Sequence, residues 1–417
     1  MRPESGSAAA AVVDRALAAR AEANERFFAA EAPRLARCCH RMAERFARGG
    51  RLLALGPTPA ARSDARHVSV EFVHPVIVGK RALPAVALTA EGGPLERQLE
   101  GLVGPDDIVI GFGLDGPAAG AEEVAACLRR AAGAGCEVIG FGPGVPEAAG
   151  AGWSFDPPSA DPAVRQELVE TLYHILWELV HVFFDQRGLL EGRAERARHA
   201  RDSGAASFLY PFLGEDRGDL EAVLRDVEAS VRMKAAEVSE LRAQTIAGSR
   251  ELLLAAAATL RAAFATGGHL LAFGNGGSAT DAMDAVADFR ALAGSGPARA
   301  ALDLTEDAPI ITAVANDIGA EEIFQRQLIA WGRAGDVALA FSTSGGSENL
   351  IEGLAEARRL GIATIALVGY DGGRIAAERL ADHVIVSPSQ HVPRIQEAQA
   401  TVYHLLCDLC ELEEDEL

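Results

Sequence analysis

The sequence is poor in aromatic residues and in basic side chains. Aromatic residues make up 6% of its 417 residues, whereas glycine alone occurs 43 times. This balance favours closely packed helices over an extended β-sandwich. Lys and Arg together number 39 against 59 Asp and Glu, which gives a net charge of −20. Such a charge argues against nucleic acid as the main partner, because a phosphate backbone is bound by clusters of Lys and Arg.

Long hydrophobic runs and a dense set of cysteines are also missing. No stretch approaches the ~18 uninterrupted apolar residues of a membrane span, and the first residues lack a clear signal-peptide pattern. We therefore expect a cytoplasmic protein with no membrane partner. The six cysteines are too few for a disulfide framework. Cys407 and Cys410 form a C-x-x-C on a predicted helix with leucines nearby, where core packing is favoured over a redox or zinc role.

An internal repeat organises the chain. RLLALG at 51–56 matches HLLAFG at 269–274, and RQELVETLYHIL at 165–176 matches IQEAQATVYHLL at 395–406. Each half alternates apolar strand segments with helical segments, which is typical of a parallel sheet covered by helices. The sequence therefore predicts an α/β protein with two tandem, doubly wound, three-layer α/β/α domains with parallel sheets, each preceded by long helices.

The predicted domain boundaries follow from the repeat. Residues 1–190 form the first domain and residues 218–417 the second. Residues 191–217 are charged and rich in Ala and Gly, as a linker would be.

Two glycine- and serine-rich turns of the second half are candidate anion sites. GNGGS at 274–278 follows an apolar strand and opens a helix, and STSGGSEN at 342–349 does the same after a later strand. Glycines let the backbone approach a phosphate, and the first N–H groups of a helix have no partner within the helix. Either turn alone is equally well an ordinary loop, but ligands of doubly wound sheets bind where neighbouring strands end. Two such turns in one sheet therefore favour a phosphate site.

These turns carry a family resemblance. Together with ANDIG at 315–319, VGYDGGRIA at 368–376 and the final helix, they resemble the sugar isomerase (SIS) domain family, and within it the phosphoheptose isomerases. The similarity covers most of residues 220–415 and, more weakly, residues 8–185. It implies a three-layer α/β fold, assembly through helices and substrate sites at domain interfaces. It also implies a metal, usually zinc, held by a His and a Glu one helical turn apart and by a Gln and a His on the last helix.

The first half keeps the metal-type positions of the family. By resemblance these are His67, Glu71, Gln166 and His174. Taken singly, His67 and Glu71 also fit a surface ion pair, and His174 fits a packed core histidine. Its phosphate loops are degraded to GPTPA at 56–60 and GLDGP at 113–117, and the equivalent of ANDIG is missing.

The second half shows the opposite pattern. By resemblance its substrate-binding residues are Asn275, Gly276, Gly277, Ser278, Asp317, Ser342, Thr343, Ser344, Ser347 and Gln396. Asp284 and Asp288 stand where His and Glu are expected, with His404 still present, so these three are weaker metal candidates. Pro393 replaces an expected aspartate, which puts one sugar contact in doubt.

The resemblance implies a phosphosugar aldose–ketose isomerase of the sedoheptulose 7-phosphate type. Such a reaction passes through an enediol and needs a base, an acid and charge stabilisation. By resemblance Glu71 is the base and His174 the acid, with zinc as cofactor and a phosphorylated sugar as substrate. We hypothesise that the first half supplies these groups and the second half the phosphate cradle. The alternative is a non-catalytic phosphosugar sensor or scaffold. The duplication further predicts a homodimer of two-domain chains, a pseudo-tetramer.

The sequence leaves one pairing open. His67 and Glu71 can meet Gln166 and His174 of their own half, or Gln396 and His404 of the other half.

Overall fold

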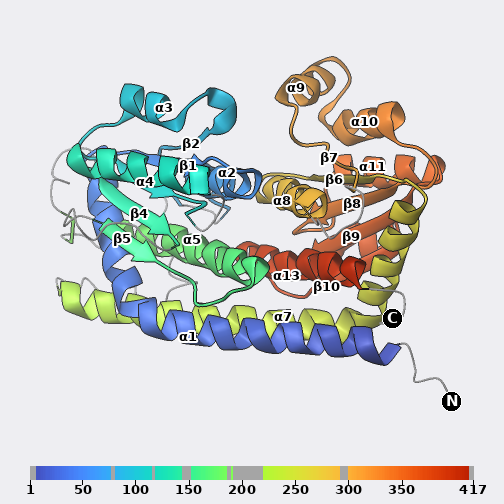
Figure 1. Cartoon of the computed structure of the whole chain (residues 1–417), viewed down its shortest axis with the longest axis horizontal. Helices are drawn as coiled ribbons and strands as arrows, with labels where there is room; N and C mark the ends of the chain where they lie inside the picture. The colour runs from blue at the N-terminus through green and yellow to red at the C-terminus, as the bar shows by residue number, and fades with distance from the viewer. Residues whose placement is uncertain are drawn as a thin grey trace. The chain divides into compact units, whose positions relative to one another are not determined.

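The computed structural model describes residues 6–76, 80–114, 118–142, 152–185, 189–190, 219–291 and 299–412 (Figure 1). The chain divides into two compact units. Unit A covers Ala23–Ala236, and unit B covers Met1–Glu22 together with Glu237–Leu417. The predicted linker at 191–217 lies outside the described residues.

Unit A contains a five-stranded parallel sheet in the order β2-β1-β3-β4-β5. Its strands are β1 (Leu52–Gly56), β2 (Ala85–Thr89), β3 (Ile108–Gly111), β4 (Glu137–Phe141) and β5 (Gly152–Phe155). Its helices are α2 (Pro59–Val73), the short η1 (Ala90–Gly92), α3 (Leu95–Leu102), α4 (Ala118–Gly133) and α5 (Pro162–Asp185). The edge strand β5 is short and mostly half-buried, and it was not predicted from the sequence.

Unit B repeats this topology with the strand order β10-β9-β8-β6-β7. Its strands are β6 (Leu270–Gly274), β7 (Ala301–Asp303), β8 (Val337–Ser342), β9 (Ala363–Gly369) and β10 (His383–Ser387). Its helices are α8 (Gly277–Ala291), α9 (Ala308–Asp317), η5 (Ala320–Glu322), α10 (Ile323–Trp331), α11 (Glu348–Arg359), α12 (Gly373–Ala377) and α13 (Val392–Glu411). In both units the second strand along the chain forms an edge, the first lies next to it and the third is central, as a duplication requires.

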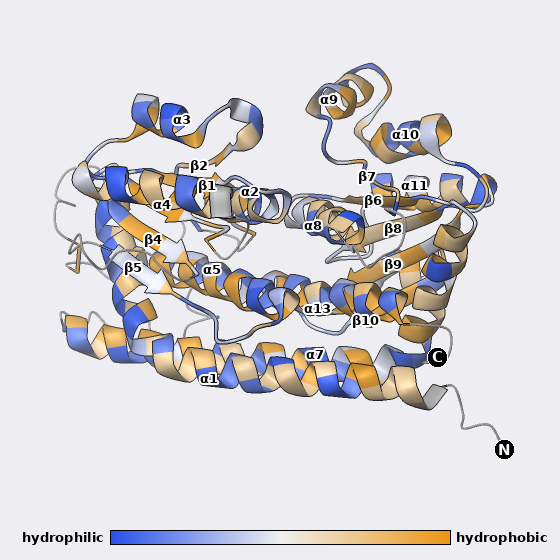
Figure 2. Cartoon of the chain, viewed as in Figure 1, coloured by the Kyte–Doolittle hydropathy of each residue, from blue (hydrophilic) through white to orange (hydrophobic). Residues whose placement is uncertain are grey.

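Both faces of each sheet are covered, which explains the continuous apolar strands. Side chains alternate between the two faces along a strand. In β6, Leu270 and Ala272 belong to one buried cluster, while Leu271 and Phe273 belong to another. The strands are accordingly mostly hydrophobic along their length (Figure 2). The predicted fold of two tandem doubly wound three-layer domains is confirmed.

Two long helices, α1 (Gly6–Ala47) and α7 (Leu220–Ala265), contribute to both cores. Val13 at the start of α1 packs in unit B in one cluster with Leu253 of α7, whereas the later residues of α1 pack in unit A. Conversely, Val227 and Val231 at the start of α7 pack in the core of unit A. Each core is therefore completed by a helical segment from the other half of the sequence.

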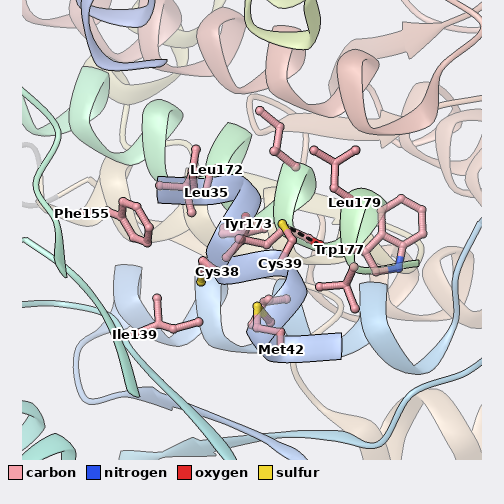
Figure 3. Close-up of a cluster of buried hydrophobic side chains, with 14 of the residues drawn as sticks. Leu35, Cys38, Cys39, Met42, Ile139, Phe155, Leu172, Tyr173, Trp177 and Leu179 are labelled. Carbon is pink, nitrogen blue, oxygen red and sulfur yellow. Dashed lines mark hydrogen bonds between the residues drawn. The ribbon is translucent and has the colours of Figure 1, made fainter. Parts of the chain in front are cut away.

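The cysteines behave as core residues. Cys38 and Cys39 of α1 lie against Tyr173 and Trp177 of α5 in the cluster shown in Figure 3. Cys407 and Cys410 are buried and unbridged, in agreement with the predicted packing role. Burial raises the pKa of Cys410 to about 12, so its thiol stays protonated.

Among the helices that the structure describes, none is both long and apolar enough to cross a bilayer.

The shared helices predict that an N-terminal substitution destabilises unit B. Val13 is fully buried there, so Val13→Asp places an unpaired carboxylate in the core and should cost about 3 kcal/mol or more. Hydrogen exchange of β6 should then accelerate. Ala18→Asp, at an exposed position of the same helix, is the matched control. Unchanged protection of β6 in Val13→Asp would contradict the shared core.

Candidate functional site

The predicted metal and acid–base residues of unit A meet in the core. His67 and Glu71 lie one turn apart on α2, and His174 lies on α5. Thr58 caps the start of α2 by accepting a hydrogen bond from the Ala61 backbone N–H, and Pro59 occupies the first turn. The three side chains are buried, with residue exposures of 2%, 2% and 0%. A surface ion pair between His67 and Glu71 is therefore ruled out.

The imidazole of His67 is held from both sides. Its Nδ1 is hydrogen-bonded to the Tyr173 hydroxyl at 3.0 Å, and its Nε2 lies 3.3 Å from Nε2 of His174. The same Nε2 lies 3.9 Å from Oε1 of Glu71. His67 and Glu71 therefore meet His174 of their own half, which answers one part of the pairing that the sequence left open.

Tyr173 was missed as a functional residue. By holding Nδ1 it orients the His67 ring, as outer partners of metal-binding histidines commonly do. The internal repeat could have indicated this residue, because the Tyr-His pair recurs in the second half as Tyr403 and His404.

The electrostatics of this cluster favour neutral side chains. Burial, together with the nearby charge of Glu178, raises the pKa of Glu71 to about 8. Burial and the neighbouring His174 hold the pKa of His67 well below its usual range. Oε2 of Glu71 has no hydrogen-bond partner among the described residues, so this buried oxygen lacks compensation that a bound group would supply.

The cluster fits a divalent metal ion. In a tetrahedral zinc site with Zn–N bonds near 2.0–2.1 Å, two ligand atoms lie about 3.3–3.4 Å apart. The 3.3 Å between the Nε2 atoms of His67 and His174 agrees with this spacing. One ligand atom from each of His67, Glu71 and His174 lies within 4.8 Å of the others. Gln166 is half-buried on α5, two helical turns before His174, and its part in the site stays a prediction.

Unit B has the same frame with different groups. The Tyr403 hydroxyl donates to Oδ2 of Asp284 at 2.5 Å, and Nε2 of His404 lies 3.2 Å from Oδ2 of Asp288. Asp284, Asp288 and His404 each offer an atom within 4.8 Å of the others. These weaker metal candidates are therefore brought together. Both carboxylates already have a protein partner, unlike Oε2 of Glu71.

The two predicted phosphate turns lie side by side in unit B. β6 and β8 are neighbours in parallel register, with Gly274 opposite Phe341, so the turns that follow them leave the same edge of the sheet. The Gly345 N–H donates to Ser342 Oγ at 3.0 Å. Ser347 stands at the N-cap of α11 but makes no side-chain capping bond, which leaves its hydroxyl and the first N–H groups of α11 available to an anion.

A neighbouring segment supports the second turn. Gly345 has φ +62°, and a Cβ there would lie 2.1 Å from the Gly372 carbonyl oxygen. A Cβ on Gly373 would lie 2.3 Å from the Ser344 carbonyl oxygen. The glycines of the VGYDGG motif are thus required by close backbone packing.

The remaining predicted substrate residues lie in different settings. Gly276 has φ +59°, Gly277 begins α8 and Ser278 is buried in its first turn. Gln396 is buried on α13. Asp317 is exposed at the end of α9, where its carboxylate accepts a hydrogen bond from Asn316 at 2.7 Å. No described hydrogen bond joins Asp317 to either turn.

The degraded turn of unit A has Pro57 close to two glycines. A Cβ on Gly120 would lie 3.4 Å from the ring of Pro57, and one on Gly113 would lie 3.7 Å from it. Thr58 also caps α2, so the helix start is partly satisfied. Of the second degraded turn, residues 115–117 lie outside the described residues.

Comparison with known proteins agrees with these features. The family model described as SIS domain matches residues 235–369. The phosphoheptose isomerase of Sulfurimonas denitrificans is 44% identical over 141 residues, 34% of this chain and 71% of the relative. That of Aquifex aeolicus is 41% identical over 196 residues, 46% of this chain and 96% of the relative.

A solved structure matches the whole two-unit chain. The C-terminal domain of glucosamine-fructose-6-phosphate aminotransferase from Francisella tularensis has a TM-score of 0.59 at 10% identity, covering 95% of this chain and 94% of its own. At this identity the match shows a shared fold. The sequence relatives, at about 40% identity over about half of the chain, show the closer kinship. The chain therefore belongs to the SIS-domain family and is related to the phosphoheptose isomerases.

Proposed function

We propose that the protein is an aldose–ketose isomerase for a phosphorylated sugar, of the sedoheptulose 7-phosphate type. The carrying observation is the buried cluster of Glu71, His67 and His174, in which the pKa of Glu71 is raised to about 8. The intact turns of unit B and the kinship to phosphoheptose isomerases support a phosphosugar substrate.

The residues of unit A suit proton transfer between adjacent carbons. A general base works best when its pKa lies near the working pH, and burial brings Glu71 into that range. In the proposal, Glu71 removes the proton from the carbon and returns it to the neighbouring carbon. His174 donates a proton to the carbonyl oxygen as the enediol forms, and it takes a proton from the neighbouring hydroxyl as the enediol collapses and that hydroxyl becomes the new carbonyl. The Tyr173 hydroxyl holds Nδ1 of His67, which keeps the His67 ring beside Nε2 of His174.

Zinc is the proposed cofactor. His67, Glu71 and His174 would hold it, with Gln166 as the fourth ligand that the resemblance implies. When bound, the ion would polarise the carbonyl and stabilise negative charge on oxygen. A carboxylate oxygen that binds a metal is a weaker base, so the base role falls to whichever oxygen of Glu71 remains unligated.

A phosphate group suits the turns of unit B. Its ligands in the proposal are the backbone N–H groups and hydroxyls of the turns at 274–278 and 342–347. These groups bind phosphate without a basic surface, which is compatible with the net charge of −20.

A phosphosugar sensor is the second candidate. It is favoured by one observation: among the described residues, neither unit holds a complete set of groups. In unit A, Pro57 stands where unit B has Asn275, and in unit B, Asp284 and Asp288 are paired with Tyr403 and His404.

Substitution of the acid and the base tests the enzyme. Glu71→Gln and His174→Ala should each lower kcat on sedoheptulose 7-phosphate by about 10²–10⁴-fold, since each removes one proton-transfer group. Glu100→Gln, on the exposed side of α3, is the matched control and should keep full activity. Wild-type turnover in Glu71→Gln would refute the assignment.

Metal content separates the two candidates. The purified chain should carry close to one zinc per chain, and His67→Ala should lose it. Asp284→Asn should keep it, because the equivalent carboxylates of unit B have protein partners. Elemental analysis of the three proteins gives the answer. A metal-free protein that still binds sugar phosphate would favour the sensor.

We also propose a homodimer, in which a second copy of the chain covers α9 and α10. Helix α9 is apolar, yet none of its residues is buried. Ile318 and Trp331 are 56% and 57% exposed, and exposed apolar patches with Trp are typical of interfaces.

Sedimentation tests the dimer. The wild-type chain should sediment at twice its 43.7 kDa, and Trp331→Asp should shift it to a single chain. Leu102→Asp, at an exposed leucine of α3, is the control. A dimer that survives Trp331→Asp combined with Ile318→Asp does not use this surface.

A further inference from the structure

Two asparagine side chains join the phosphate turns of unit B. Nδ2 of Asn275 donates to Oδ1 of Asn349 at 2.9 Å, and Nδ2 of Asn349 donates to Oδ1 of Asn275 at 2.9 Å. Asn275 follows β6 directly, and Asn349 is the second residue of α11. The pair is therefore a closed ring of two hydrogen bonds that joins the two turns.

The position of this pair matters because it links the two turns directly to each other. β6 and β8 fix the residues up to Gly274 and Phe341 through their register. Beyond these residues the first turn runs into α8 and the second into α11. The Asn275–Asn349 pair restrains the spacing of the two helix starts, whose unbonded N–H groups would face the anion.

The chemistry of the pair suits a phosphate site. Each carboxamide keeps one N–H and one oxygen lone pair outside the ring, and neither carries a charge that would repel phosphate. The one carboxylate of the same helical turn, Glu348, is paired with Arg374 at 2.7 Å, so its negative charge is compensated.

Unit A lacks the pair as well as the cradle. Pro57 follows β1 where Asn275 follows β6. Proline has neither a side-chain amide nor a backbone N–H, so it cannot form such a link. The amide pair therefore occurs in the half that keeps the phosphate turns.

We propose that Asn349 is a positioning residue of the phosphate site, which acts by locking Asn275 and so the two turns into one cradle. This inference rests on the proposed function in that it takes the ligand to be the phosphate of a sugar phosphate. It changes the role of Asn275 from an independent phosphate contact to one half of a clasp.

A double-mutant cycle on the full chain tests the clasp. Binding of inorganic phosphate is measured by calorimetry for wild type, Asn275→Ala, Asn349→Ala and the double variant. Each single variant should bind about tenfold more weakly, which corresponds to about 1.4 kcal/mol and lies within the usual cost of a lost hydrogen bond. The double variant should bind no more weakly than either single one, because both remove the same clasp.

Kinetics and a control complete the test. With sedoheptulose 7-phosphate, KM should rise about tenfold in Asn349→Ala while kcat stays within twofold, which a general loss of folding would not produce. Gln244→Ala, at an exposed glutamine of α7, should behave as wild type. Wild-type phosphate affinity in Asn349→Ala, or affinity losses that simply add in the double variant, would overturn the clasp. If the wild type shows no isomerase activity but the cycle shows coupling, the clasp stands and the isomerase proposal fails.

Discussion

The packing of α1 and α7 into both cores is the constraint on which the rest of the structure depends. Each helix is continuous, and each places one end in unit A and the other in unit B. Because hydrophobic burial is the main stabilising term in folding, neither half of the sequence contains all of its own core. Stability is thus shared between the halves, through residues such as Val13 and Val227.

The two units share one fold, and a few residue differences give their sites different chemistry. In unit A, α2 packs against α5, which carries Tyr173 and His174. In unit B, α8 packs against α13, which carries Tyr403 and His404. In unit A the Tyr-His pair lies against His67 and Glu71, which burial keeps neutral. Oε2 of Glu71 has no hydrogen-bond partner among the described residues. With Asp284 and Asp288 the same hydroxyl and imidazole become partners of carboxylates. In unit A a carboxylate oxygen is left for a cation, whereas in unit B the carboxylates are already bonded to the tyrosine and the histidine.

The sequence predicted the sheets, the turns and the buried cluster for identifiable reasons. Apolar strands covered on both faces form continuous runs, and the i, i+4 spacing of His67 and Glu71 needs only a helix to bring them together. The fifth strand, β5, was missed because Gly152–Phe155 is a short edge strand of four residues that are mostly half-buried, and it lacks an apolar run. The crossing of α1 and α7 between the cores was also missed, since periodicity shows which face of a helix is buried but not which core receives it. Asn349 escaped notice because its partner lies 74 positions away.

The two roles proposed for Glu71 place different demands on its two oxygens. Oε1 lies 3.9 Å from Nε2 of His67, on the side of the two imidazoles, whereas Oε2 has no hydrogen-bond partner among the described residues. A pKa near 8 arises because burial disfavours the charged carboxylate, and a cation beside Oε1 would lower it again. Metal binding would therefore ionise Glu71 at neutral pH and leave Oε2 as the unligated base. Burial raises the pKa of Glu71, so its carboxylate is a stronger base but is ionised at neutral pH only beside a cation. The proposed roles of Glu71 as metal ligand and as base therefore depend on each other.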